Sequence, residues 1–137
     1  MKAPVGIPYN MFSEYTMSGQ ARVEYRYAND CSDEVQKIIN DNFTEEVFTE
    51  SLRRVKNKEQ NYYGHTDTWL YESLEKYPIT GKHICIMGST HPWYEALAIA
   101  NGVERCTVIE YSPRQTFHEK IRYIQPRELD GQQFDAC

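Results

Sequence analysis

The fold is decided by residues 83–110, which read HICIMGSTHPWYEALAIANGVERCTVIE. The run His83–Met87 is apolar without a break, which is typical of a strand covered on both faces. Gly88 ends this run, and a second apolar run, Cys106–Ile109, ends at Glu110. A helical segment joins the two runs, so the stretch predicts a βαβ unit. Its connection is long enough for a right-handed crossover, which makes the two strands parallel neighbours.

The joining helix carries start and stop signals. Ser89 and Thr90 are candidate N-caps, and Pro92 suits the first helical position. We expect Trp93 to anchor this helix in the core. Gly102 suits the position just past the helix end, where a left-handed backbone is common.

Downstream of Glu110 the chain continues in short β-rich runs. Lys120–Ile124 is a candidate third strand, and Phe134–Cys137 reads as the start of a fourth. The link at 112–119 is too short for a full-length helix. We therefore predict an α/β protein, in which N-terminal helices precede an incomplete Rossmann-like parallel sheet of about three or four strands.

Residues 1–80 are polar, tyrosine-rich and helical in pattern, and we expect them to form a mostly helical lead-in to a domain at 81–137. The alternation in Val23–Tyr27 predicts one short strand. Three helices should follow, the last of them ending near Tyr77 because Pro78 disfavours helical geometry there. Their expected caps are Asp30 or Ser32, Thr44, and Thr66 or Asp67.

Charge and hydropathy exclude some function classes. Lysine and arginine number 15 against 20 acidic residues, a net charge of −5, which argues against nucleic acid as the main partner. The basic cluster Arg53–Lys58 is expected to be a solvated helix end rather than a phosphate site. No apolar run approaches the roughly 20 residues that span a bilayer. The first residues lack an apolar signal region, so a cytoplasmic location is the default expectation, and an upstream signal or anchor stays open as the alternative.

The four cysteines, Cys31, Cys85, Cys106 and Cys137, form no C-x-x-C pair, which argues against a zinc ribbon. Cys85 and Cys106 fall in apolar runs and are expected to be buried free thiols. No metal site is predicted, since the adjacent pair at 118–119 has no third ligand at a suitable spacing.

Two features predict a nucleotide site. Gly88 follows the first strand, where a Cβ would obstruct a ligand that approaches the backbone, and the next helix points its N–H groups into the same crevice. Glu110 follows the second strand, 22 residues after Gly88, close to the spacing of an acid that binds ribose hydroxyls. His91 is expected to be exposed at the helix entry rather than to act as a general base.

The stretch IMGSTHPWYEA at 86–96, followed by TVIEY at 107–111, resembles a nematode-rich family of unknown function that is similar to class I S-adenosylmethionine-dependent methyltransferases. The shared pattern is a glycine-serine turn, a proline-tryptophan pair, a small-residue helix and a strand that ends in glutamate-tyrosine. It continues through the Pro-Arg-Glu-Leu stretch at 126–129 to Asp135 and covers about 56 residues.

The resemblance implies a cofactor half-site for S-adenosylmethionine. Gly88 and Ser89 would line the methionine and ribose side, Glu110 would hold the ribose diol, and Tyr111 would lie against the adenine. Gln125 maps loosely to a further adenine contact. The residues that usually touch the methyl acceptor follow the fourth strand, so the resemblance implies that this chain alone lacks the acceptor-binding half and is inactive. No catalytic residue is predicted, and neither a methyl acceptor nor a protein partner is identified.

Two other functions stay open. A nicotinamide-dependent protein would use Glu110 in the same way, although the turn has one glycine where the dinucleotide fingerprint has three. A non-catalytic interaction module is the third, because an open sheet with an incomplete fourth strand leaves an edge that invites pairing.

Overall fold

The structure is a computed structural model that describes residues 6–23, 32–112 and 114–137. The strand expected at Val23–Tyr27 falls mainly on residues outside these ranges. In chain order the elements are η1 (Tyr9–Met11), α1 (Phe12–Tyr15), α2 (Asp33–Asp41), α3 (Glu45–Lys56), α4 (His65–Lys76), β1 (His83–Met87), α5 (Trp93–Ala100), β2 (Arg105–Ile109), β3 (Ile121–Ile124) and η2 (Pro126–Glu128).

The chain divides into two compact units, Met1–Gln36 and Lys37–Cys137. The first unit contains the short elements η1 and α1, and α2 begins near its end. The second unit contains α3, α4 and the whole sheet, so these two helices belong to the same compact body as the strands. No helix in the described ranges combines the length and apolar character needed to cross a membrane.

The sheet of the second unit is parallel, as predicted. Within the described residues it has the order β1-β2-β3, with His83 opposite Arg105 and Cys106 opposite Ile121. On the free side of β1, an isolated parallel bridge pairs Ile84 with Ala136. The segment expected to start a fourth strand therefore runs along β1. The resulting order of β3, β2, β1 and this segment is that of the first four strands of a doubly wound sheet, 3-2-1-4.

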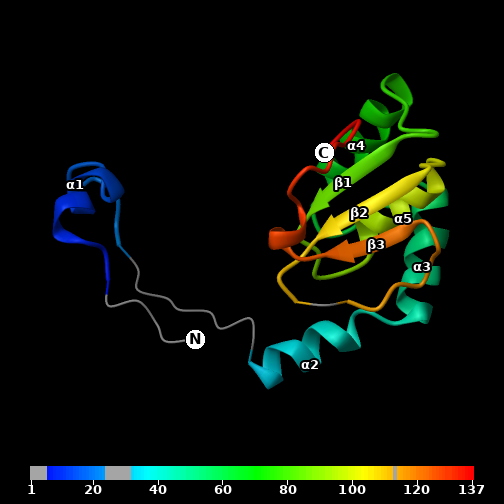
Figure 1. The fold of residues 1–137 in the computed structure, drawn as a ribbon. Coiled ribbons are helices and arrows are strands. Elements are labelled where there is room, and N and C mark those ends of the chain that lie inside the picture. The colour runs from blue at the N-terminus through cyan, green and yellow to red at the C-terminus, as the bar shows by residue number, and fades with distance from the viewer. Residues whose placement is uncertain (1–5, 24–31, 113) are drawn as a thin grey trace. The chain divides into compact units, whose positions relative to one another are not determined.

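Helices cover one face of the sheet (Figure 1). The βαβ helix α5 packs against β1 and β2, and α3 lies alongside α5. Ser51 of α3 and Ala96 and Ala98 of α5 are buried, in agreement with the packing of α5 against both α3 and the sheet. The core on this face combines residues of α3, α4 and α5 with residues of β1, β2 and β3. It includes Val55, Tyr71, Ile84, Trp93, Leu97, Val108 and Ile121.

Helix α3 covers the part of this face near β3. The described part of the link between β2 and β3 contains no helix, in agreement with its length. The ring of Phe48 in α3 lies 6.4 Å from that of Phe117 in the link, and Phe43 meets Tyr123 of β3 edge to face at 6.1 Å. The lead-in helix therefore contributes the apolar cover that a crossover helix supplies in a complete unit.

The second face of the sheet has a smaller core. Cys85, Ile109 and Ile124 are buried there, and Leu129 and Phe134 from the C-terminal segment pack on them. Met87 is largely exposed at the end of β1. Among the described residues, no α-helix of the second unit contributes to this cluster, so the two faces differ sharply in how much apolar surface they bury.

Several expected caps are confirmed and others are wrong. Ser32 and Thr44 accept hydrogen bonds from the amides of Val35 and Val47, as predicted for N-caps. Ser89 and Thr90 do not cap α5, whose N-cap position is Pro92 and has no side-chain cap. Neither does Thr66 or Asp67 cap α4, which begins at His65 after Gly64.

The predicted glycine past α5 is confirmed. Gly102 has a φ of 74° and donates its amide to Ile99, while Val103 donates to Ala98. This pair of bonds is a Schellman motif, which needs the left-handed backbone that glycine adopts without strain.

Candidate functional site

The predicted site residues gather at the carboxyl edge of the sheet. Gly88 has a φ of 78°, a conformation that side chains disfavour, and its amide donates to Ile109 at 2.9 Å. A Cβ at Gly88 would meet no atom within 4 Å, so the space in front of this backbone is open. The glycine therefore serves both the turn and access to the backbone.

Glu110 links the ends of β1 and β2. Its Oε2 accepts from the Ser89 amide at 2.9 Å, and its Oε1 accepts from the Tyr111 amide at 2.8 Å. The guanidinium of Arg114 lies 3.9 Å from Oε1. The Glu110 side chain is 13% exposed. The two sequence features behind the predicted site, the glycine turn and the spaced acid, are therefore joined by a direct hydrogen bond.

The end of β3 joins the same edge through Gln125. Its side-chain amide donates to the Tyr111 carbonyl oxygen at 3.4 Å, and its backbone amide donates to Glu128 at 2.8 Å. Tyr111 itself is 79% exposed, with its ring free of core packing. The three strand ends thus lie in sequence along one edge, with polar groups at each.

A second carboxyl group, Glu95 in the first turn of α5, lies beneath this edge. It is 0% exposed, and its Oε1 accepts from the Tyr123 hydroxyl at 3.0 Å. Burial raises the pKa of Glu95, the Glu110 charge acts in the same direction, and hydrogen bonds from Ser89 and Tyr123 oppose the shift. Burial and Glu95 also raise the pKa of Tyr123, which stays a hydroxyl donor.

His91 is not the exposed entry residue that the sequence suggested. It is half-buried, and its Nδ1 atom is inaccessible to solvent. Burial lowers its pKa, and the nearby charge of Arg54 lowers it further, so the ring is neutral at pH 7. The expected anchor, Trp93, is buried as predicted.

Buried polar atoms without hydrogen-bond partners concentrate just after the glycine turn. Among the described residues they include His91 Nδ1, Trp93 Nε1 and Glu95 Oε2. A buried polar atom without a hydrogen-bond partner costs free energy. These three atoms lie within residues 91–95, at the start of α5.

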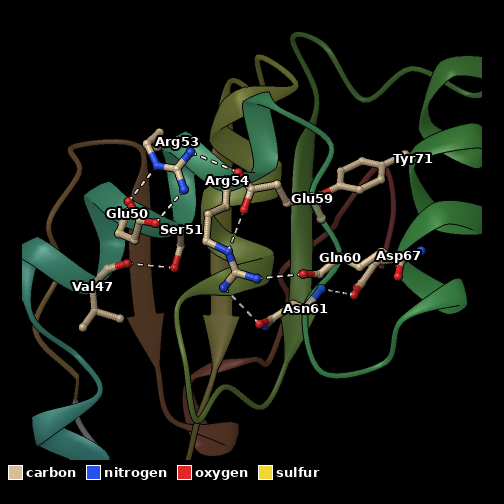
Figure 2. Close-up of polar contacts among 10 residues, drawn as sticks. All are labelled: Val47, Glu50, Ser51, Arg53, Arg54, Glu59, Gln60, Asn61, Asp67 and Tyr71. Atoms are coloured by element: carbon tan, nitrogen blue, oxygen red, sulfur yellow. Dashed lines mark hydrogen bonds and ion pairs between the residues drawn. The ribbon is translucent and has the colours of Figure 1, made fainter.

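Arg54 has a structural role, because its guanidinium is hydrogen-bonded within the protein and is not free to bind an anion. Its guanidinium donates to the Glu59 carboxylate at 3.2 Å, to the Gln60 carbonyl oxygen at 2.7 Å and to the Asn61 side chain at 3.3 Å (Figure 2). It also lies 5.0 Å from the centre of the Trp93 ring. The arginine thus fastens the loop between α3 and α4 to the base of α5.

Asp67 is also hydrogen-bonded to this loop. This buried carboxylate accepts from the Asn61 amide at 2.7 Å (Figure 2), instead of capping its own helix. The Tyr71 hydroxyl donates to the Glu59 carbonyl oxygen from the same helix. Loop residues 57–61 are therefore held from both α3 and α4.

Sequence reasoning missed Glu95 as a member of the site. A glutamate in a first helical turn is usually explained by the helix dipole and by solvent. The sequence of the helix could have indicated this role. Apart from Glu95, all residues of Trp93–Ala100 are apolar or aromatic, which is typical of a helix buried on all sides.

Comparisons with protein-family models, with curated proteins and with solved structures found no match to this chain.

Proposed function

We propose that the carboxyl edge of β1 and β2 binds S-adenosylmethionine, and that the chain is the cofactor-binding part of a methyltransferase-like protein. The observation that carries the proposal is the hydrogen bond from the Ser89 amide to Glu110. It holds the glycine turn and the strand-end acid together at the edge where ligands of open parallel sheets bind.

The residues present fit this cofactor. An ionised carboxylate has about four lone-pair sites, and backbone amides use two of those on Glu110. The remaining two suit the two hydroxyl groups of a ribose. The open space at Gly88 admits a ligand close to the backbone, and the exposed Tyr111 ring offers a stacking surface for a base. When bound, the cofactor would supply an electrophilic methyl group.

Isothermal titration calorimetry with S-adenosylmethionine tests the proposal. We expect the folded chain to bind, and Glu110→Gln to weaken binding by about tenfold to a hundredfold, because a hydrogen bond to a charged group is lost. The matched control is Glu104→Gln, which changes an exposed glutamate just before the start of β2 and should leave affinity unchanged. No binding at millimolar ligand by a chain shown to be folded would refute the proposal.

The same titration with a nicotinamide dinucleotide separates the nearest alternative. Binding of the dinucleotide, with none of S-adenosylmethionine, would assign Glu110 to a nicotinamide-cofactor ribose.

One observation favours the non-catalytic alternative. Both Glu110 oxygens already accept backbone amides, so the turn is hydrogen-bonded at this carboxylate without a ligand. Under this alternative Glu110 stabilises the fold alone. Glu110→Gln would then lower the free energy of unfolding, while neither ligand would bind the parent chain.

A further inference from the structure

Two cysteines meet where the C-terminal segment runs along β1. The Asp135 amide donates to the His83 carbonyl oxygen at 2.8 Å, and the Cys85 amide donates to the Ala136 carbonyl oxygen at 2.9 Å. The Asp135 side chain also accepts from the His83 amide at 2.8 Å. Because Ile84 pairs with Ala136 in parallel register, the next pair along the two strands is Cys85 and Cys137.

The two thiols lie on the same face of the sheet. Successive side chains of a strand alternate between faces. Ile84 and Ala136 pack in the core on the helix-covered face, whereas Cys85 belongs to the cluster on the second face. Cys137 is a hydrogen-bonding neighbour of the Cys85 side chain. Adjacent strands lie about 4.8 Å apart, which falls within the Cα separations of about 4.4–6.8 Å found in disulfides.

The two thiols differ in reactivity. Cys137 is exposed, whereas Cys85 is 4% exposed. Burial, with a contribution from Cys137, raises the pKa of Cys85 to about 11. Cys106 lies in the core on the helix-covered face, and burial raises its pKa to about 12. Among the three cysteines that the structure describes, Cys137 is therefore the one that an oxidant in solution meets first.

We propose that Cys85 and Cys137 are an oxidation site that forms an intramolecular disulfide by exchange with a small-molecule disulfide such as oxidised glutathione. The Cys137 thiolate attacks one glutathione sulfur, forms a mixed disulfide and releases one glutathione thiolate. The Cys85 thiolate then attacks the Cys137 sulfur and releases the second. Two protons leave the protein thiols, and two electrons reduce glutathione disulfide to two glutathione molecules.

The disulfide would fasten the C-terminal segment to β1 on the less covered face of the sheet. That segment carries Phe134, which packs on the second-face cluster and meets the His83 ring at 4.8 Å. Oxidation would therefore hold the apolar cover of this face in place. The proposal does not depend on what binds at the carboxyl edge.

The test incubates the full chain, in a Cys31→Ser background, with oxidised glutathione, followed by alkylation and peptide mapping without reduction. We expect one cross-linked peptide pair that joins Cys85 to Cys137, and an oxidised chain whose Tm is at least about 5 °C higher than that of the reduced chain. Cys106→Ser should form the same cross-link, because this thiol lies on the other face.

Cys85→Ser gives the matched contrast. It should keep Cys137 as a mixed disulfide with glutathione and abolish both the cross-link and the rise in Tm. A parent chain in which the Cys137 mixed disulfide persists, or in which Cys137 links two chains while Cys85 is alkylated, would overturn the proposal.

Discussion

The two faces of the parallel sheet are stabilised in different ways. One face is covered by α3, α4 and α5, and its core extends across all three strands. The other is covered by Leu129 and Phe134 of a C-terminal segment over a cluster of three buried residues. The difference shows that the lead-in helices pack on the face that α5 already covers, while the second face depends on a segment held by few backbone hydrogen bonds.

Two isoleucines of β3 allow a direct comparison of the faces. Ile121 is buried in the helix-covered core, and Ile124 is buried in the second cluster. We expect Ile121→Ala to lower the free energy of unfolding by about 3–4 kcal/mol and Ile124→Ala by about 2 kcal/mol, because the second site relaxes more easily around a cavity. Urea unfolding followed by circular dichroism measures both. Equal losses in the free energy of unfolding would show that the two faces contribute equally to stability at these positions.

A second pair of variants tests how the lead-in helices are fastened to the covered face. Arg54→Ala removes three hydrogen bonds to the loop at 59–61 and the contact with Trp93, so we expect a loss of about 1–3 kcal/mol. Arg53→Ala removes exposed ion pairs with Glu50 and Glu59 and should leave stability nearly unchanged. Similar unfolding midpoints for the two variants would refute the structural role of Arg54.

The smallest effect concerns the buried acid on the covered face. The folded-state pKa of Glu95 is raised above that of the unfolded chain, so the folded state holds this proton more tightly. Glu95 therefore favours folding at low pH, and this contribution is lost as pH rises through the folded pKa. Glu95→Gln should remove this decrease in stability with rising pH, and the variant should be more stable than the parent chain above the folded-state pKa of Glu95. Thermal melts from pH 4 to pH 8 measure it, and parallel curves for the two proteins would contradict the assignment.

The βαβ unit was predictable because its signals are local. The uninterrupted run His83–Met87, the glycine at 102 and the run before Glu110 each specify backbone geometry within a few residues. The bounds of β1 agree with the prediction for the same reason. The hydrogen bond between Ser89 and Glu110 follows from parallel topology, which brings the carboxyl ends of neighbouring strands together.

The parts that escaped prediction depend on packing between distant segments. Asp67 is a residue type that favours helix N-caps, yet its carboxylate accepts a hydrogen bond from the Asn61 amide in the preceding loop. His91 follows a turn, yet it is half-buried with its pKa lowered by burial and by Arg54 of another helix. No local pattern in α3 indicates that Phe48 will pack against Phe117. These outcomes are decided by tertiary contacts that no spacing rule encodes.

We propose that S-adenosylmethionine binds at the carboxyl edge of the sheet and not on its second face. Titration of the ¹⁵N-labelled chain with the cofactor tests it most directly, because the Ser89 and Tyr111 amides both donate to Glu110 and report on that carboxylate. We expect the chemical shifts of these two amides to change as cofactor is added and to reach a plateau at saturation, while the amide chemical shifts of Phe134 and Leu129 do not change. A folded chain whose Ser89 and Tyr111 resonances do not move at millimolar cofactor would contradict the claim.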